Sequence, residues 1–342
     1  MKSLNKVYYY IFLFIVIIYA PINLSAQENS GAVIIAYHRF GENNYPSTNI
    51  RMEQFTAHIQ ELKKEKYNIL PLDKIIESLK KGEELPDRTI AVTIDDAFES
   101  VYNIAWPKLQ ESNIPFTLFV STTAINESNK GMMTWEQIIE LSKSGVLIGN
   151  HSSSHKHLAF MEPNIWKDDI ILAQKILKEK LGTSPLLFAH PFGETNREII
   201  SFLKKEGFIA AFGQHSGVAS DWLDPYYLPR FSFNEQFGDI ARFILAINSL
   251  PIPVKEITPK NLILNNNPPL FGFTIAQKNF ETNGLQCFFS GYNKPSKIYK
   301  LSNNRIEARV DYKSNAKRIR INCTMPSDDK RWHWFGMQYL NR

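Results

Sequence analysis

The sequence predicts an α/β domain built on a mainly parallel sheet, followed by a smaller β-rich domain. Up to about residue 250, short apolar, β-branched segments alternate with segments of helical periodicity, as in parallel sheets with crossover helices. After Pro251 and Pro253, polar and apolar residues alternate in short segments, which is typical of antiparallel strands. The 342 residues suffice for one domain of about 200–250 residues and one small domain.

The alternation can be followed along the chain. Apolar runs that predict buried strands lie at residues 33–37, 90–94, 116–120, 146–150 and 186–189. Helical spacing of apolar residues lies at 52–65, 72–80, 100–111, 134–142 and 165–180. Alternating segments at 286–289, 305–310 and 317–321 predict strands of an antiparallel, sandwich-like fold. We therefore expect a first domain over residues 27–250, a linker over 251–259 and a β-rich domain over 260–342.

Residues 1–26 have the composition of a signal peptide. Lys2 and Lys6 form a positive start, residues 8–20 are apolar, and Ala26 is a small residue suited to cleavage. The alternative is an uncleaved membrane anchor, although Pro21 interrupts the run and it is shorter than the ~20 apolar residues that span a bilayer. We expect export to the periplasm or the cell exterior, where the protein meets envelope or extracellular polymer.

The charge of the chain bears on its binding partners, and its two cysteines bear on disulfide formation. The formal net charge of +5 is mild and both signs are interspersed, which argues against a nucleic-acid partner and suits approach to an anionic envelope. Cys287 and Cys323 are the only cysteines. In an exported protein they would form a disulfide within the second domain, and two buried free thiols in adjacent strands are the alternative.

Two polar segments follow predicted strands at the point where each strand ends. Asp95 and Asp96 follow residues 90–94, and His151 and His155 follow residues 145–150. The carboxyl ends of parallel strands are where α/β proteins place their chemistry, although an Asp pair there is also typical of a solvated turn or a helix cap. Two histidines four residues apart can share a metal ion, and adjacent carboxylates can divide into one ligand and one base. The pattern predicts metal-assisted hydrolysis.

With these segments the chain resembles the polysaccharide deacetylase family, the NodB-like carbohydrate esterases, from about Ala32 to Arg230. Five segments match the family in its order; they lie at residues 36–39, 93–96, 151–155, 188–194 and 228–230. The resemblance implies an irregular (β/α) barrel with the active site at the carboxyl ends of its strands. It also implies a hydrolase that acts on an acetylated glycan.

The resemblance assigns roles to individual residues. Asp95 would be the catalytic base, and Asp96, His151 and His155 would be the metal ligands. Pro191, Phe192 and Gly193 would form part of the substrate groove and the oxyanion site. Two histidines and one carboxylate suit Zn²⁺ best, with Co²⁺, Ni²⁺ or Fe²⁺ as alternatives.

The chain departs from the family pattern in two places. Ala189 stands where many members have an arginine that orients the catalytic aspartate, and we expect Arg230 to take that role. The late motif that usually supplies the general acid has no counterpart in residues 243–250, which contain no histidine. His38 follows the strand at 33–36 and is our candidate acid, with a structural role as the alternative; the other candidates are His157, His190 and His215.

The expected reaction is removal of N-acetyl groups from amino sugars of an envelope or exported polysaccharide, with Asp95 activating a metal-bound water. The alternatives are a non-catalytic glycan-binding or polysaccharide-assembly protein on the same scaffold, and an O-deacetylase.

The aromatic cluster at residues 331–339 allows two interpretations of the second domain. Alternate aromatic residues either fill a small core or stack on sugar rings, in which case the domain extends the groove or binds the polymer.

Overall fold

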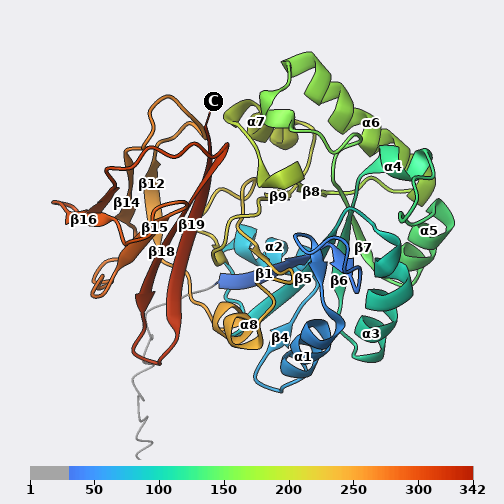
Figure 1. Cartoon of the computed structure of the whole chain (residues 1–342), viewed down its shortest axis with the longest axis horizontal. Coiled ribbons are helices and arrows are strands. Elements are labelled where there is room, and N and C mark those ends of the chain that lie inside the picture. Colours follow the sequence, from blue (N-terminus) through green and yellow to red (C-terminus); the bar gives the residue numbers. More distant parts are fainter. Residues whose placement is uncertain (1–30, 342) are drawn as a thin grey trace, which may run out of the picture.

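The computed structural model describes residues 31–341, so the predicted signal peptide at residues 1–26 lies outside this range. Within it, a barrel and a β-sandwich pack side by side (Figure 1). No helix of the described range is long and apolar enough to cross a membrane. The predicted order, an α/β domain followed by a β-rich one, is confirmed.

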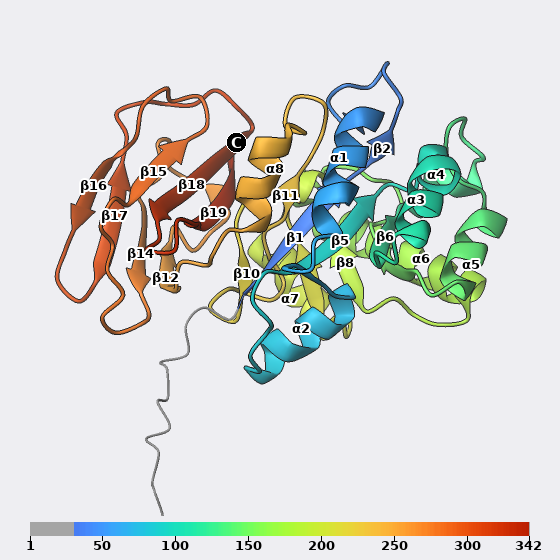
Figure 2. The ribbon, with the colours of Figure 1, turned by 90° about the horizontal axis from the view of Figure 1, so that it is seen from below.

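The first domain is a curled sheet with helices around it, which confirms the predicted irregular (β/α) barrel (Figure 2). Its central strands run parallel in the order β1-β5-β6-β7-β8-β9. These strands are β1 (Gly31–Tyr37), β5 (Thr89–Asp95), β6 (Phe116–Val120), β7 (Leu147–Asn150), β8 (Leu187–Ala189) and β9 (Ala210–Phe212). All seven residues of β5 are buried, as expected for a central parallel strand covered on both faces.

Short strands complete the barrel where no periodic pattern predicted them. They are β4 (Asn68–Ile69) beside β5, and β10 (Ala219–Ser220) and β11 (Phe231–Ser232), which both pair with β1. Leu228 also forms a bridge with Phe212 of β9. The segment 228–232 therefore connects β9 to β1, and Arg230 lies inside this closure.

All five predicted helices are present with shifted ends, and three helices that were not predicted lie at residues 122–126, 197–205 and 240–247. The helices are α1 (Met52–Leu62), α2 (Leu72–Lys81), α3 (Trp106–Glu111), α4 (Thr122–Asn126), α5 (Trp135–Lys143), α6 (Pro163–Leu181), α7 (Arg197–Lys205) and α8 (Ile240–Ile247). The helix predicted at 100–111 differs, because residues 101–105 form a π-helix before α3 begins. Pro107 has no N–H for a regular helical bond, and the widened turn lies directly ahead of it.

The second domain consists of two four-stranded sheets, in the orders β12-β14-β17-β16 and β13-β19-β18-β15. The strands are β12 (Val254–Thr258), β13 (Ile263–Leu264), β14 (Phe271–Ile275), β15 (Gln286–Phe289), β16 (Lys297–Lys300), β17 (Arg305–Arg309), β18 (Arg318–Pro326) and β19 (Trp332–Asn341). Both sheets contribute to one apolar core, in which Phe271 and Phe273 of one contact Phe335 of the other. The predicted sandwich is confirmed, although the short pair β13–β19 is parallel. Cys287 and Cys323 face each other across β15 and β18 and form a disulfide.

The segment expected to be a linker contains a strand. Residues 254–258 form β12, which pairs antiparallel with β14. The prolines that suggested a linker, Pro253 and Pro259, flank this strand, where a residue without an N–H interrupts no ladder bond. The β-sandwich therefore begins inside the range 251–259.

Strand β19 joins the two domains. The backbone of Trp334 donates a hydrogen bond to Leu250 and accepts one from Val218 of the first domain, and its ring packs against Phe231 of β11. A Cβ atom at Gly336 would lie 1.9 Å from the Ser216 carbonyl oxygen, so this approach requires glycine. Phe335 and Tyr339 lie in the sandwich core, which favours the packing interpretation of the aromatic cluster.

His58 of α1 is a buried neutral histidine that makes stability depend on pH. Its Nε2–H donates to the Gly238 carbonyl, its Nδ1 accepts from the Tyr37 hydroxyl, and its ring stacks on Phe243. Burial lowers the pKa of His58 to about 4, whereas the unfolded chain protonates it near 6.5. Below pH 6.5 the unfolded state therefore binds more protons, and stability falls as the pH drops towards 4.

We expect His58 to account for up to about 3 kcal/mol of the stability lost between pH 6.5 and 4. The measurement is the free energy of unfolding in urea at several pH values, for the wild type and for His58→Gln. The variant should lose less stability over this interval than the wild type. Parallel pH curves for the two proteins would show that His58 does not carry the effect.

Candidate active site

Most residues predicted to carry chemistry lie at the carboxyl ends of four strands in a run of five adjacent ones. His38 follows β1, the Asp95-Asp96 pair ends β5, the 151–155 loop follows β7, and the turn at 191–193 follows β8. Because β1, β5, β6, β7 and β8 are adjacent and parallel, their carboxyl ends lie on one rim of the barrel. The fold thus gathers segments that are up to about 150 residues apart in the sequence.

Asp95 forms a buried, two-pronged ion pair with Arg230. The guanidinium Nη1 and Nη2 each donate to one carboxylate oxygen at 2.7 Å, and both side chains are fully buried. Arg230 also donates to the Thr93 hydroxyl and the Gly213 carbonyl, which fixes its plane. Burial alone would raise the pKa of Asp95, but the charge and hydrogen bonds of Arg230 outweigh it and hold the pKa below its usual value. Asp95 is therefore ionised and fixed in orientation.

Asp96, His151 and His155 form a cluster whose geometry fits a tetrahedral metal ion. Asp96 Oδ1 lies 3.4 Å from His151 Nε2 and 3.2 Å from His155 Nε2. Ligands bound at about 2.0–2.1 Å with tetrahedral angles lie about 3.4 Å apart, so both separations match. One nitrogen or oxygen of each residue lies within 4.8 Å of the others. Two histidines and one carboxylate leave at least one coordination position free for a reactant.

The hydrogen bonding and burial of the two histidines suit ligands. His151 Nδ1–H donates to the Ala189 carbonyl at 2.7 Å, which leaves the lone pair on Nε2, and this buried Nε2 has no hydrogen-bond partner among the described residues. A carbonyl behind the ring is the usual support of a metal-binding imidazole. Burial lowers the pKa of His155 to about 4, so its ring is neutral near pH 7.

The loop that carries both histidines is held by residues that the sequence did not single out. The Asp169 carboxylate accepts the N–H groups of Ser153 and Ser154, and Asn150 Oδ1 accepts that of Ser152. Ser152 Oγ in turn accepts from His155 N. These bonds build the tight loop from α6 and β7, and Asp169 looks like an ordinary solvated residue of an amphipathic helix in the sequence.

Several residues of the same rim have strained backbone. Asp96, Ser152, His155 and Phe192 have φ values of 75°, 65°, 50° and 59°, in the left-handed region that non-glycine residues rarely adopt. Each such residue costs about 1–3 kcal/mol and persists where the surrounding structure enforces it, most often at functional sites. The strain supports a functional role for this rim.

The turn at 191–193, predicted to form part of the substrate groove and the oxyanion site, lies beside the cluster. The Phe192 ring contacts His155 at 4.6 Å and stacks on His157 at 4.1 Å between ring centroids. Gly193 is required here, because a Cβ atom would lie 2.4 Å from Gln214 N and φ is +66°. The turn is therefore shaped tightly against the loop at 213–217.

The second domain reaches this turn through β19, which the sequence did not indicate. The fully buried Gln338 side chain donates to the carbonyls of Gly193 and Phe192, at 2.9 and 3.3 Å, and its Oε1 accepts from Arg320. The Tyr227 hydroxyl also contacts the Gly193 carbonyl. A single glutamine in an alternating strand gives no sequence signal that separates it from solvent-facing neighbours.

The four histidines considered as acids occupy different places. His38 Nε2 lies 3.8 Å from Asp95 Oδ2, with its side chain 13% exposed. His157 Nδ1 lies 2.7 Å from a Glu194 carboxylate oxygen. His190 and His215 are buried, and burial lowers their pKa values to about 4 and about 3. Of the four, His38 is the one placed to act beside Asp95.

Comparison with known proteins points to one family. Residues 82–211 match a family model described as polysaccharide deacetylase. The chain is 26% identical over 243 residues to poly-β-1,6-N-acetyl-D-glucosamine N-deacetylase of Staphylococcus aureus, covering 63% of this chain and 83% of that protein. It is 23% identical over 207 residues to a putative polysaccharide deacetylase, YxkH, of Bacillus subtilis, covering 60% and 73%.

Solved structures share the fold of the barrel. IcaB from Ammonifex degensii has 25% sequence identity and a TM-score of 0.57, with 65% of this chain and 99% of that chain covered. The Streptococcus pyogenes deacetylase PplD has 19% identity and a TM-score of 0.59, with coverages of 64% and 99%. About a third of the present chain thus has no counterpart in either. The matched range holds both aspartates, both cluster histidines and the 191–193 turn, and the chain is similar to polysaccharide deacetylases in sequence and in the fold of its barrel.

Proposed function

We propose that this protein hydrolyses the N-acetyl groups of amino sugars in an exported polysaccharide, of the poly-N-acetylglucosamine type on which its Staphylococcus aureus relative acts. The observation that carries the proposal is the ionised, doubly held Asp95 next to the cluster of Asp96, His151 and His155. An oriented base beside a three-ligand site is what attack of water on an amide requires.

In this mechanism Asp95 accepts a proton from the attacking water. The new bond joins the water oxygen to the acetyl carbon, and the carbon–nitrogen bond then breaks to release acetate. Arg230 occupies one direction of each carboxylate oxygen, and each oxygen keeps a further lone pair for the proton. Arg230 is a positioning residue, since it acts through Asp95.

Asp96, His151 and His155 would hold a divalent metal, for which Zn²⁺ is our first choice and Co²⁺, Ni²⁺ and Fe²⁺ are alternatives. When bound, such an ion supplies a Lewis acid that polarises a carbonyl and lowers the pKa of water towards about 7. The backbone N–H of Phe192 adds a hydrogen-bond donor for the oxyanion, and Pro191 and Gly193 shape the turn that presents it.

His38 is the proposed general acid. The departing amine needs a proton when the carbon–nitrogen bond breaks, and His38 lies 3.8 Å from Asp95 at the partly exposed edge of the site. A protonated His38 beside the Asp95 carboxylate would donate to the sugar nitrogen. His38, which follows the first strand, would thus be the general acid that the late family motif usually supplies.

The alternative of a non-catalytic glycan-binding or assembly protein has less support. Two departures from the family pattern favour it, the missing arginine at Ala189 and the missing late histidine, but Arg230 reaches both oxygens of Asp95 from the barrel closure. The buried ion pair is costly to keep without a use, because a hydrophobic replacement is often neutral or stabilising. An intact base, cluster and strained rim favour turnover.

The substrate and the place of action are parts of the same proposal. An N-acetylated polymer outside the cytoplasm agrees with the predicted leader at residues 1–26 and with the substrate that the relative's name states. We therefore propose export to the periplasm or the cell exterior, in contact with envelope polymer.

The test is release of acetate from β-1,6-linked N-acetylglucosamine oligomers by the mature protein, after reconstitution with Zn²⁺, Co²⁺ or Ni²⁺. The His151→Ala variant should release none and should bind less metal. Release of acetate from an O-acetylated glycan, but not from the N-acetylated oligomer, would assign the protein as an O-deacetylase. No release from either, with metal bound and the fold intact, would favour the binding protein.

Gln338 should affect turnover from the second domain. Gln338→Leu removes the donors to Gly193 and Phe192 and leaves two buried carbonyls with fewer partners, so the turn can shift. We expect kcat to fall about tenfold to a hundredfold with metal content unchanged. The matched control is Gln286→Leu, at an exposed position of β15, which should keep the wild-type kcat. Equal kcat values for the wild type and Gln338→Leu would remove this role.

A further inference from the structure

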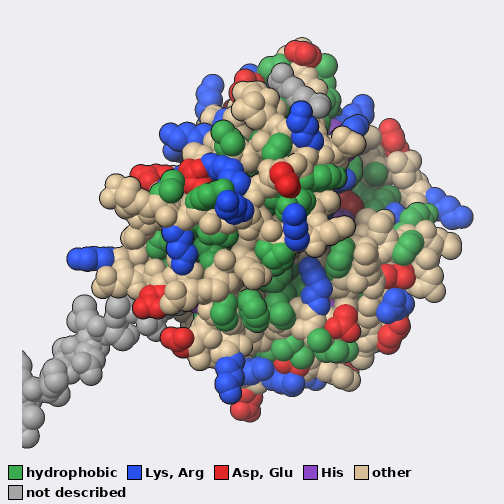
Figure 3. Space-filling model, turned by 60° about the vertical axis from the view of Figure 1, so that its left-hand side comes forward, with side chains coloured by type: hydrophobic (Ala, Val, Ile, Leu, Met, Phe, Trp, Pro, Cys, Tyr) green, Lys and Arg blue, Asp and Glu red, His purple; other side chains and the backbone are tan. Residues whose placement is uncertain are grey.

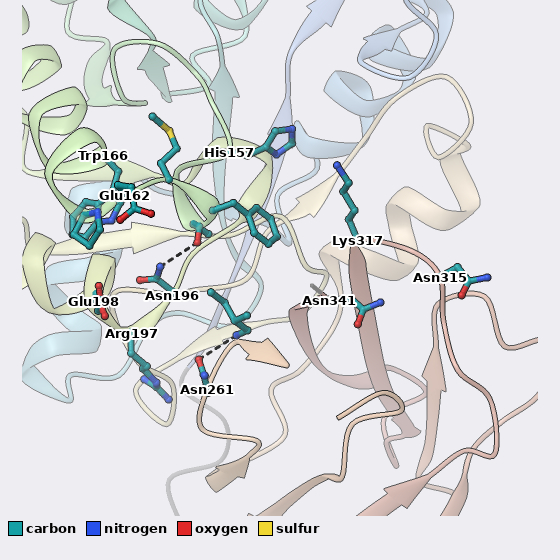
Figure 4. A pocket seen from close by; sticks show the side chains of 15 residues that line it. His157, Glu162, Trp166, Asn196, Arg197, Glu198, Asn261, Asn315, Lys317 and Asn341 are labelled. Atoms are coloured by element: carbon teal, nitrogen blue, oxygen red, sulfur yellow. Dashed lines mark hydrogen bonds between the residues drawn. The ribbon is translucent and has the colours of Figure 1, made fainter. Parts of the chain in front are cut away.

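A cleft of about 1080 Å³ lies between the barrel and the β-sandwich. One wall comes from the segment 157–163 and the starts of α6 and α7, and the other from residues 261–263, the loop before β18 and the end of β19. Figure 4 shows Glu162, Asn196 and Arg197 on one side and Asn315, Lys317 and Asn341 on the other. The volume slightly exceeds the range, about 300–1,000 Å³, of pockets that hold drug-sized ligands.

The cleft lies next to the candidate active site. His157 lines it and also stacks on Phe192, whose ring contacts His155 of the cluster. The contact of His157 Nδ1 with Glu194 Oε2 fixes this ring, and Arg318 of β18 lies 3.6 Å from Glu194 Oε1. A ligand held in the cleft is therefore separated from the cluster by the rings of His157 and Phe192, and the second domain forms one wall around it.

The lining is polar, with unused hydrogen-bonding groups. Within residues 31–341, the side chains of Asn315, Lys317, Glu162 and Glu198 make no hydrogen bond or ion pair, although all four line the cleft. Phe160 adds an aromatic face that is 44% exposed. Two carboxylates oppose the two basic side chains of Lys317 and Arg197, so neither sign of charge is in excess.

Side chains of both charges are also mixed on the surface of the molecule. On the face drawn in Figure 3, Lys and Arg side chains are scattered, with Asp and Glu side chains among them. The cleft is thus lined by amide and aromatic side chains without an excess of charge. Such a lining can bind uncharged sugars through their hydroxyl and acetamido groups.

We propose that this interdomain cleft binds N-acetylated sugar units of the same polymer chain, next to the unit whose acetyl group is removed. The inference rests on the proposed function and adds a site that the barrel alone does not have. The second domain then makes the enzyme selective for long chains, because a short oligomer fills the reaction site and leaves the cleft empty.

The test compares kcat/KM for acetate release across β-1,6-linked N-acetylglucosamine oligomers from dimer to hexamer. The cleft variant is Asn315→Ala with Lys317→Ala, two exposed residues whose side chains have no partners within residues 31–341, so the fold should be unaffected. The control is Asn293→Ala with Lys313→Ala, exposed residues of the same domain that do not line the cleft. We expect the cleft variant to be about tenfold slower on the hexamer and nearly unchanged on the dimer, with the control like the wild type.

Loss of rate on all lengths alike, no loss, or the same loss in the control would overturn the cleft proposal while the deacetylase assignment stands. If the wild type releases no acetate from any oligomer, the proposed function fails. The cleft proposal is then tested by measuring the binding of the hexamer. Titration calorimetry with the hexamer should then show about tenfold weaker binding to the cleft variant than to the wild type. Equal binding, or none to either protein, would overturn the cleft as a glycan site.

Discussion

Replacing Asp95 by asparagine is expected to lower the rate of acetate release by about 10²–10⁴-fold, the usual contribution of a positioned base. The Arg230 charge and hydrogen bonds keep the wild-type carboxylate ionised, whereas an amide cannot accept the proton from water. Asp95 is not part of the cluster of Asp96, His151 and His155, so metal content should stay close to that of the wild type. The measurement is the initial rate together with bound metal.

The same change leaves Arg230 buried beside a neutral group, and breaking a buried ion pair costs about 3–5 kcal/mol. Rates must therefore be compared well below the melting temperature of the variant. Asp328→Asn, at an exposed position, is the matched control and should keep the wild-type rate. An Asp95→Asn protein that is folded, loaded with metal and still as fast as the wild type would exclude Asp95 as the base.

Replacing Arg230 by alanine is the second large effect that we expect, with turnover lower by about a hundredfold. Without the guanidinium, the Asp95 carboxylate loses the two bonds that fix its plane. Burial would then raise the pKa of Asp95, since the charge that outweighed it is gone. The acid limb of the pH–rate profile should therefore move to higher pH, which a general loss of fold would not cause.

Arg230→Lys separates charge from geometry. A lysine keeps the positive charge but cannot form the two-pronged contact. Relative to Arg230→Ala, the pH–rate profile should therefore return closer to that of the wild type than kcat does. Metal content should be close to normal in both variants, since the hydrogen bonds of Arg230 go to Asp95, Thr93 and Gly213 and not to the cluster. Wild-type turnover in Arg230→Ala would rule out the orienting role.

The barrel could be predicted because its long strands are buried on both faces and therefore read as continuous apolar runs between amphipathic helices. The strands β9, β10 and β11 have only two or three residues, too few for any periodicity, and they depend on their neighbours for pairing. Strand β12 was hidden for another reason, because prolines at the ends of a strand and prolines in a linker look alike in a sequence.

The cluster of Asp96, His151 and His155 could be predicted because its residues follow buried strands closely, and neighbouring parallel strands bring their ends together. The pairing of Arg230 with Asp95 depended on the family motif, since the two are brought together only by the short barrel closure at 228–232. Asp169 and Gln338 could not be predicted, because their roles depend on hydrogen bonds to backbone groups that are distant in the sequence. Asp169 accepts from the N–H of Ser153, and Gln338 donates to the carbonyl of Gly193.

The place of Gln338 on β19 has a consequence for the order in which the enzyme becomes competent during synthesis. Asp95 emerges from the ribosome more than two hundred residues before Gln338, a delay of roughly 10–50 s at the usual rate of about 5–20 residues per second. A chain arrested before β19 would already contain every residue of the base, the cluster and the turn. It would nevertheless lack the side chain that fixes the carbonyls of Phe192 and Gly193. We therefore expect the chain to bind metal before it reaches its full rate of acetate release.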